Sequence, residues 1–107
     1  MSITIESGQG TRKDPNSIEV FEMDWDSQRL NPTVQIASSS WIVTAPANDS
    51  TPITTDQPSI LAGNRKTQVR LSAGTLWKKY TVTNRIVTNE TPAQTLDASF
   101  TVVILQE

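Results

Sequence analysis

The stretch YTVTNRIVT, residues 80–88, decides the fold because its apolar residues recur at every second position. Tyr80, Val82 and Ile86 share one face of an extended chain, which is the spacing of a β-strand with one buried side. Asn84 falls on that same face, although an amide is not an ordinary core side chain. The stretch therefore predicts a half-buried strand that turns one polar residue toward the core.

The same two-residue periodicity recurs along most of the chain, and no segment has the spacing of an amphipathic helix. Strands are expected at residues 18–25, 33–45, 65–72, 79–88 and 96–105. Residues 46–59 carry three prolines and are expected to form a surface connection or a ragged edge. Several short strands without helices are typical of a β-sandwich, in which two antiparallel sheets bury alternating side chains between them.

The N-terminal segment differs from the rest of the chain. Ile3 and Ile5 alternate only briefly, and Gly8 and Gly10 follow them. Because glycine loosens the backbone, residues 1–12 are predicted to be a flexible or extended arm. Residues 13–107 are predicted to be one β-sandwich domain, since a chain of 107 residues is long enough to bury a core of its own.

The composition argues against most classes of enzyme. The chain has no cysteine and no histidine, so it lacks disulfides, thiolate nucleophiles and the usual general base near neutral pH. The serines of Ser38–Ser40 therefore have no histidine to activate them. We predict that the protein is not an enzyme and has no catalytic residues, no metal site and no cofactor.

The net charge and the hydropathy of the chain argue against two classes of partner, nucleic acids and membranes. Nine basic and eleven acidic residues give a net charge of −2, which is not the basic footprint of a nucleic-acid-binding protein. No apolar run approaches the roughly 18 residues of a membrane span, and the N-terminus does not have the pattern of a signal peptide. Neither nucleic acid nor a membrane is expected as a partner.

Three carboxylates alternate along and just beyond one predicted strand, at Glu22, Asp24 and Asp26. Grouped carboxylates can hold calcium, which prefers oxygen ligands. Their spacing does not match that of a calcium-binding loop, however. An acidic strand that faces solvent and resists edge-to-edge pairing is the better explanation.

Basic residues occur at Arg65-Lys66, Lys78-Lys79, Arg70 and Arg85. They would form a patch for phosphate or nucleic acid if their strands were neighbours. Stacking platforms for nucleic acid combine such a patch with several aromatic rings, whereas only Trp77 lies nearby in the sequence. Solvated side chains that flank a hairpin are therefore the better explanation.

Trp77 lies in the connection before the strand at 79–88. It is either a core lid beneath that turn or an exposed anchor for a partner, because tryptophan is enriched at interface hot spots. A large exposed ring is the rarer case in an isolated domain, so the lid is favoured, and Trp77 is kept as an interface candidate. Trp25 and Trp41 lie within alternating strands and are expected in the core.

Four longer stretches occur in a characteristic order. They are KDPNSIEVFEMDW at 13–25, SSSWIV at 38–43, LSAGTLWKKYTVTNRIVT at 71–88 and ASFTVVI at 98–104. In this order they resemble a family of small immunoglobulin-like proteins encoded among the structural genes of tailed bacteriophages, the fibre-tail adaptor proteins. Members look like K-D-P-D, a strand that ends in D-W, S-S-x-W, L-S-G-G, Y-x-V-x-N-x-I-x-T and S-F-x-V-x-V. The resemblance covers most of the chain.

The resemblance implies an all-β, immunoglobulin-like β-sandwich of about seven antiparallel strands. It also implies that five residues define the fold, namely Trp25, Trp41, Tyr80, Asn84 and Phe100. Asn84 would be a structural polar anchor, because an inward amide stabilises a sandwich only when its donors and acceptors are paired. The chain departs from the family where Ala73-Gly74 replaces a glycine pair and where Lys78-Lys79 replaces a glycine before the tyrosine.

By the same resemblance, the protein would be a non-enzymatic structural part of a bacteriophage virion, made in the host bacterial cytoplasm. Its expected role is that of an adaptor in the tail or neck that docks fibres or other tail components. The expected partners are other virion proteins of the tail, neck, portal or capsid, and multiple symmetric copies of this chain are expected. Residues 1–12 suit strand addition to a neighbour's sheet, with Ile3 and Ile5 as anchoring side chains.

Two alternatives stay open. One is a capsid decoration (cement) protein on the outer shell, which is also immunoglobulin-like in many phages. The other is a carbohydrate-binding module that would use Trp77 and the acidic stretch Asp24–Asp26, with calcium. The connection at 46–64 is longer than the family pattern and is a candidate for a partner contact of this chain's own.

Overall fold

Eight β-strands make up the described part of the protein. The structure is a computed structural model and describes residues 2–5, 8–25, 30, 33–49 and 51–105, with side chains from residue 4 onward. The strands are β1 (Ser2–Ile5), β2 (Gly10–Lys13), β3 (Glu19–Asp24), β4 (Ile36–Thr44), β5 (Thr54–Ile60), β6 (Lys66–Ser72), β7 (Lys79–Thr88) and β8 (Thr95–Ile104). Among these residues, no helix is long and apolar enough to cross a membrane.

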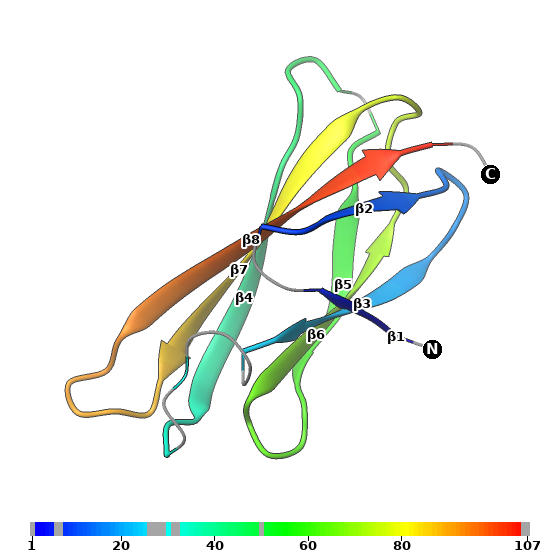
Figure 1. Ribbon diagram of the computed structural model, residues 1–107. Helices are drawn as coiled ribbons and strands as arrows, with labels where there is room; N and C mark the ends of the chain where they lie inside the picture. Colours follow the sequence, from blue (N-terminus) through cyan, green and yellow to red (C-terminus); the bar gives the residue numbers. More distant parts are fainter. Residues whose placement is uncertain (1, 6–7, 26–29, 31–32, 50, 106–107) are drawn as a thin grey trace.

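The strands form two four-stranded sheets that pack face to face (Figure 1). The first sheet has the order β1-β3-β6-β5, and the second has the order β2-β8-β7-β4. Neighbours within each sheet are antiparallel except at one edge, where β1 is parallel to β3 and β2 is parallel to β8. The all-β sandwich predicted from the periodicity is confirmed, and the arrangement is consistent with an immunoglobulin-like fold. The prediction of about seven antiparallel strands omitted the two short parallel edges.

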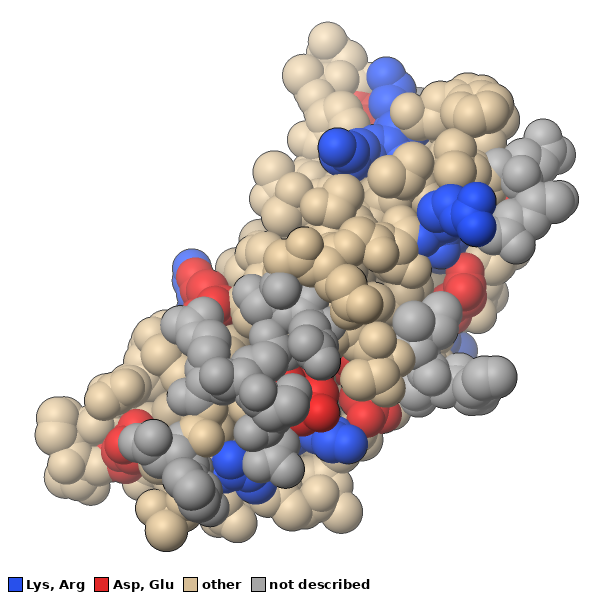
Figure 2. Space-filling model, in the orientation of Figure 1, with Lys and Arg blue, Asp and Glu red and all other residues tan. Residues whose placement is uncertain are grey.

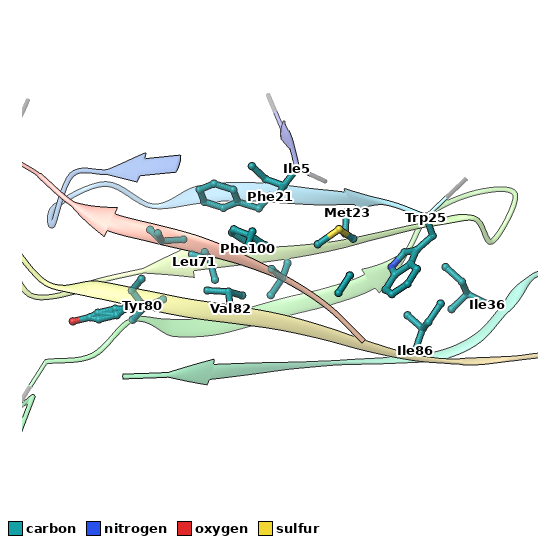
Figure 3. Close-up of a cluster of buried hydrophobic side chains, with 14 of the residues drawn as sticks. Ile5, Phe21, Met23, Trp25, Ile36, Leu71, Tyr80, Val82, Ile86 and Phe100 are labelled. Atoms are coloured by element: carbon teal, nitrogen blue, oxygen red, sulfur yellow. The ribbon is translucent and has the colours of Figure 1, made fainter. Parts of the chain in front are cut away.

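One core lies between the sheets. The inward residues of the central strands are Phe21, Met23, Val69 and Leu71 in the first sheet and Tyr80, Val82, Ile86, Ala98, Phe100, Val102 and Ile104 in the second. Their two-residue spacing places them all on one face of each strand, so each of the central strands β3, β6, β7 and β8 buries a row of apolar side chains. The rings of Phe21 and Phe100 stack across the two sheets with centroids 5.7 Å apart, and Figure 3 shows them side by side.

Residues 1–12, predicted to be an N-terminal arm, lie along both sheets in their described parts. β1 adds to the edge of the first sheet, where Ile5 is opposite Met23 and its side chain is only 3% exposed. Gly8, with a φ of 83°, then donates its N–H to the Ser99 carbonyl, and β2 continues along β8. Strands of four residues are too short to show a reliable periodicity in the sequence, which is why they were not predicted.

The proline-rich stretch 46–59 contributes a ragged edge. β5 pairs with β6 with a shift in register between Asp56 and Ser59, and Gln57 between them has a φ of 49°. A bulge of this kind bends an edge strand and interrupts its pairing. The side chains of β5 are almost all exposed, in contrast to the alternating burial of β6.

Candidate functional site

The Asn84 side chain joins the two sheets. Its Oδ1 accepts hydrogen bonds from Trp25 Nε1 at 2.8 Å and from Thr67 Oγ1 at 2.5 Å, both on the first sheet's side of the core. Its Nδ2 donates to Ser39 Oγ and to the Ser40 carbonyl of the neighbouring strand β4, both at 2.9 Å. All four hydrogen-bonding positions of the amide are used, although Asn84 has no exposed surface. This arrangement is structural and leaves no group for chemistry.

The other residues predicted to define the fold also lie in or against the core. Trp25 and Tyr80 are fully buried, and Phe100 is 2% exposed. Trp41, on the edge strand β4, is half-buried and packs against the core from its margin. Its indole Nε1 is buried without a hydrogen-bond partner among the described residues.

A polar cluster closes the end of the sandwich at which β7 begins. The Asp49 carboxylate accepts hydrogen bonds from the hydroxyls of Thr75 and Tyr80 and from the Thr51 N–H. The Thr75 N–H in turn donates to Tyr80 Oη at 2.9 Å. These bonds fasten the connection between β4 and β5 to the turn between β6 and β7.

The hydrogen bonds and the burial within the cluster shift the pKa values of Asp49 and Tyr80. The hydrogen bonds from Thr75 and Tyr80 hold the pKa of the Asp49 carboxyl below its usual value. Burial, together with the hydrogen bond to Asp49, raises the pKa of the Tyr80 phenol. Both shifts favour a charged Asp49 beside a neutral Tyr80, which is the state in which the bonds form.

The buried side chain of Lys13 forms hydrogen bonds at the same end of the molecule. Its side chain is fully buried, and its Nζ donates to the Ala73 carbonyl at 2.8 Å and to the Asp14 carbonyl at 3.0 Å. Burial lowers the pKa of the Lys13 ammonium, although the carboxylates of Glu19 and Asp14 act in the opposite direction. Lys13 is therefore a tie between β2 and the β6–β7 turn and is not free to contact a partner.

Trp77 is exposed, so the favoured interpretation of it as a core lid was wrong. Its side chain is 73% exposed, and its φ of 71° lies in the left-handed region that bulky residues rarely adopt. Its N–H donates to the Ile104 carbonyl at 2.8 Å, and the Lys78 N–H donates to the Thr75 carbonyl at 3.1 Å. The backbone of the turn is thus bonded to β8 while the ring faces solvent.

The remaining interface candidates lie at the N-terminal edge. Ile5 contributes its side chain to the core, so contact between that side chain and a partner would require β1 to leave the sheet. Ile3 lies opposite Phe21 in the register of β1 and β3. Both residues lie on β1 of the first sheet, whereas Trp77 lies beside the end of β8 in the second sheet.

The acidic stretch does not form a recognisable metal site. Glu22 and Asp24 lie on β3, and Asp26 falls outside the described residues. Among the residues that the structure describes, no three His, Cys, Asp or Glu side chains are grouped so that they could hold a metal ion.

The basic residues are also dispersed. Lys66 lies 3.7 Å from Glu22, and Arg70 and Arg85 form ion pairs with Asp56 and Asp97. The Arg65 guanidinium donates to the carbonyls of Val34 and Leu30, so it holds the connection before β4. The residues named as a possible phosphate patch therefore have separate structural partners, except for the pair Lys78-Lys79.

A shallow hollow of about 280 Å³ lies between the edges of β4 and β5. Its lining residues are Ser39, Pro58, Ser59 and Ile60. None of these side chains titrates, and the Ser39 hydroxyl already accepts the hydrogen bond from Asn84. Among the described residues that line it, none could act as a general base.

Sequence reasoning missed the cluster around Asp49. An Asp two residues before an N–H that it accepts is a common turn, so PANDSTP could have indicated a turn at Asp49. Its bond to Tyr80 joins residues 31 positions apart, and no periodicity reports such a contact.

Comparison with known proteins gives the same fold and adds a family. No curated protein matches the chain. The crystal structure of the cysteine protease inhibitor EhICP2 from Entamoeba histolytica is similar, with a TM-score of 0.53 and 15% identity over 96% of this chain and 94% of that one. At this identity the likeness concerns the fold alone. A family described as podophage GP4 fiber-tail adaptor protein gp77 matches residues 13–103, which include β3 to β7 and most of β8. The chain therefore belongs to the podophage fibre-tail adaptor family.

Proposed function

We propose that this protein is a structural adaptor in the tail or neck of a bacteriophage, where it docks a fibre or another tail component. The observation that carries the proposal is the match to the fibre-tail adaptor family across residues 13–103. That match covers β3 to β7 and most of β8, so it concerns most of the folded body rather than one short motif.

The geometry suits a passive connector. The body measures 43 × 28 × 22 Å and has a continuous core, with an exposed tryptophan at one end. A rigid body that offers separate surfaces can hold two partners at a constant distance, because little conformational entropy is lost when they bind. We propose that the partners are other virion proteins and that several symmetric copies, made in the host cytoplasm, enter each virion.

Quantitative mass spectrometry of purified virions tests the proposal. We expect this chain at a copy number close to that of the portal protein, because an adaptor of the tail or neck follows the symmetry of that region. A copy number that scales with the major capsid protein would instead indicate a decoration protein on the shell. Absence of the chain from virions would overturn the proposal.

The carbohydrate-binding alternative has little support in the geometry. Trp77 lies at the end of the sandwich where β3 begins, since Glu19 is opposite Leu71 at the end of β6. Asp24 lies opposite Lys66 at the other end of β3, five residues further, or roughly 16 Å along the strand. The ring and the acidic stretch that this function would combine are therefore not brought together.

A further inference from the structure

We propose that Trp77, Lys78, Lys79 and Arg12 form one docking surface, here called the Trp77 surface, which binds an acidic surface of another virion protein. The inference rests on the proposed function, because it assigns the adaptor one of its contact sites and the charge of the partner. Three observations carry it: the exposed and fixed ring of Trp77, the unpaired cations beside it, and the pairing of charged residues elsewhere on the sheets.

Trp77 has a strained backbone conformation, although its exposed side chain adds little to the core. Its φ of 71° is unfavourable for a large side chain, and the 73% exposure of the side chain means that little burial compensates. Strained residues of this kind concentrate at binding sites, where the surrounding structure holds them in place. Here the holding contacts are the bonds from Trp77 N–H to the Ile104 carbonyl and from Ile104 N–H to the Lys78 carbonyl. A ring on a fixed turn loses little entropy when it enters a partner's pocket.

Two cations flank the end of β8 beside this turn. Lys79 on β7 and Arg12 on β2 are both opposite Val103, so the three residues share one row on the outer face of the second sheet. Both cations are exposed, and across two strand spacings their backbones lie roughly 10 Å apart. Neither pairs with an acidic side chain in the described ranges 2–5, 8–25, 30, 33–49 and 51–105. Lys78 lies near the Asp49 carboxylate, whose charge it helps to stabilise.

Charged side chains elsewhere on the two sheets form ion pairs, whereas Arg12 and Lys79 of the Trp77 surface do not pair with a described acidic side chain. Further along the same face, Arg85 and Asp97 neutralise each other, and on the first sheet Lys66 is paired with Glu22. Figure 2 shows Lys and Arg side chains at the upper end of the molecule, where β8 and β2 end in Figure 1, with a small acidic area among them, whereas the Lys and Arg side chains at the lower end lie close to larger acidic areas. Charge complementarity therefore favours an acidic partner.

The occupant is a protein rather than a nucleic acid. A groove for a nucleic acid strand combines many cations with several aromatic rings, whereas this surface has one exposed ring and three exposed cations. One tryptophan surrounded by cations is the composition of a protein interface, in which a ring fills a pocket and arginine or lysine contacts the rim.

Substitution of the ring separates binding from folding. Asparagine tolerates the left-handed backbone much better than tryptophan, so Trp77→Asn should leave the melting temperature unchanged or higher. We expect Trp77→Asn, supplied to a phage that lacks the gene, to lower the copies per purified virion by about tenfold, as is typical of a hot spot. Ile18→Asn is the matched control, because Ile18 is 63% exposed and is not one of the four residues of the Trp77 surface. It should incorporate like the wild type.

Charge reversal tests the second half of the proposal. Lys79→Glu should reduce incorporation several-fold and make it fall further when virions are washed at low ionic strength, where repulsion is least screened. Lys66→Glu is the control, since it reverses one partly exposed lysine on the other sheet. Equal loss in both variants would show that net charge matters and not this surface, and would overturn the inference.

A carbodiimide applied to wild-type virions identifies the partner's chemistry, because it joins a lysine amine to a carboxylate only when the two are in contact. We expect a crosslink from Lys78 or Lys79 to an Asp or Glu of another virion protein. Crosslinks only to a second copy of this chain, or none from either lysine, would overturn the inference.

Different results would overturn the proposed function and the Trp77 surface. Absence of wild-type protein from virions overturns the proposed function and the inference together. Wild-type incorporation that is unaffected by Trp77→Asn and Lys79→Glu leaves the adaptor function in place and overturns only the Trp77 surface.

Discussion

Asn84 makes every hydrogen bond that an amide can make, and it does so with no exposed surface. Its partners come from β4, from β6 and from Trp25 just beyond β3, so the two sheets share one polar contact inside an apolar core. A fully satisfied amide of this kind opposes sliding of one sheet over the other, because any shift would leave buried donors and acceptors unpaired.

Asn84→Ala should therefore lower the free energy of unfolding by about 3 kcal/mol. The substitution leaves the Trp25 indole N–H and the Thr67 hydroxyl buried without their acceptor. Chemical denaturation monitored by tryptophan fluorescence measures the change. Thr83→Ala, on the same strand, removes only the half-buried bond to Ser99 and should cost less than about 1 kcal/mol. Similar losses in the two variants would contradict the anchor role.

The Asp49 cluster gives stability a dependence on pH. The folded-state pKa of Asp49 lies below its unfolded value, so its contribution is fully present above the unfolded pKa of about 3.9. It is lost as the pH falls through the folded-state pKa. We expect the wild type to melt at a higher temperature than Asp49→Asn at pH 7, with the difference shrinking between about pH 5 and pH 2. A difference that stays constant over this range would show that the carboxylate charge is not involved.

At the scale of elements, the β6–β7 turn packs tightly against the core at Gly74. Gly74 has a φ of 106°, and a Cβ on it would lie 2.7 Å from Ile104 Cδ1 and 3.1 Å from Ile53 Cγ1. The turn is therefore pressed against the core from outside. Only glycine satisfies both the backbone angle and the space at this position.

Gly74→Ala should lower the free energy of unfolding by about 3 kcal/mol, because it adds left-handed strain and an overpacked methyl group. Gly63→Ala is the matched control, since Gly63 has a φ of 91° but no atom within 4 Å of the added Cβ. It should cost only the strain, about 1 kcal/mol. Thermal unfolding of both variants measures the difference, and equal costs would mean that Gly74 is not in tight contact.

The strand β1 can be tested as an element in its own right. Ile5→Ala should lower the free energy of unfolding by about 2 kcal/mol, because the Ile5 side chain is buried against the first sheet. Thr4→Ala changes an exposed residue of the same strand and should be nearly neutral. A neutral Ile5→Ala would indicate that this segment is detached in solution, as expected of a free arm.

The sequence predicted the elements unevenly, for physical reasons. β7 and β8 each have ten residues whose apolar side chains mostly alternate, so their periodicity identifies them. β1 and β2 have four residues each and depend on long-range partners. Asn84 could be placed on the inward face by counting, whereas its four partners could not be named. Trp77 is exposed on a turn where its φ is 71°, and the residue type predicts neither the angle nor the exposure.

At the scale of the whole molecule, the two ends of the sandwich differ in kind. One end carries the Asp49 cluster, the Lys13 tie and the Trp77 surface, all gathered around the end of β8. The other end carries the turn at 61–65 and the loop at 89–94, which Figure 1 shows far from the first. An elongated body with unlike ends has a direction, as a connector between two different partners requires.

The position of the last strand also decides how the protein can be labelled. The Ile104 carbonyl accepts the Trp77 N–H, and the Leu105 N–H donates to Lys13, so the chain leaves β8 directly beside the Trp77 surface. A fluorescent protein or affinity tag attached directly after Leu105 would crowd that surface. The weaker binding that it caused would look like a loss of function. A short epitope inserted in the loop at 89–94, at the opposite end, would report the protein's place in the virion without covering it.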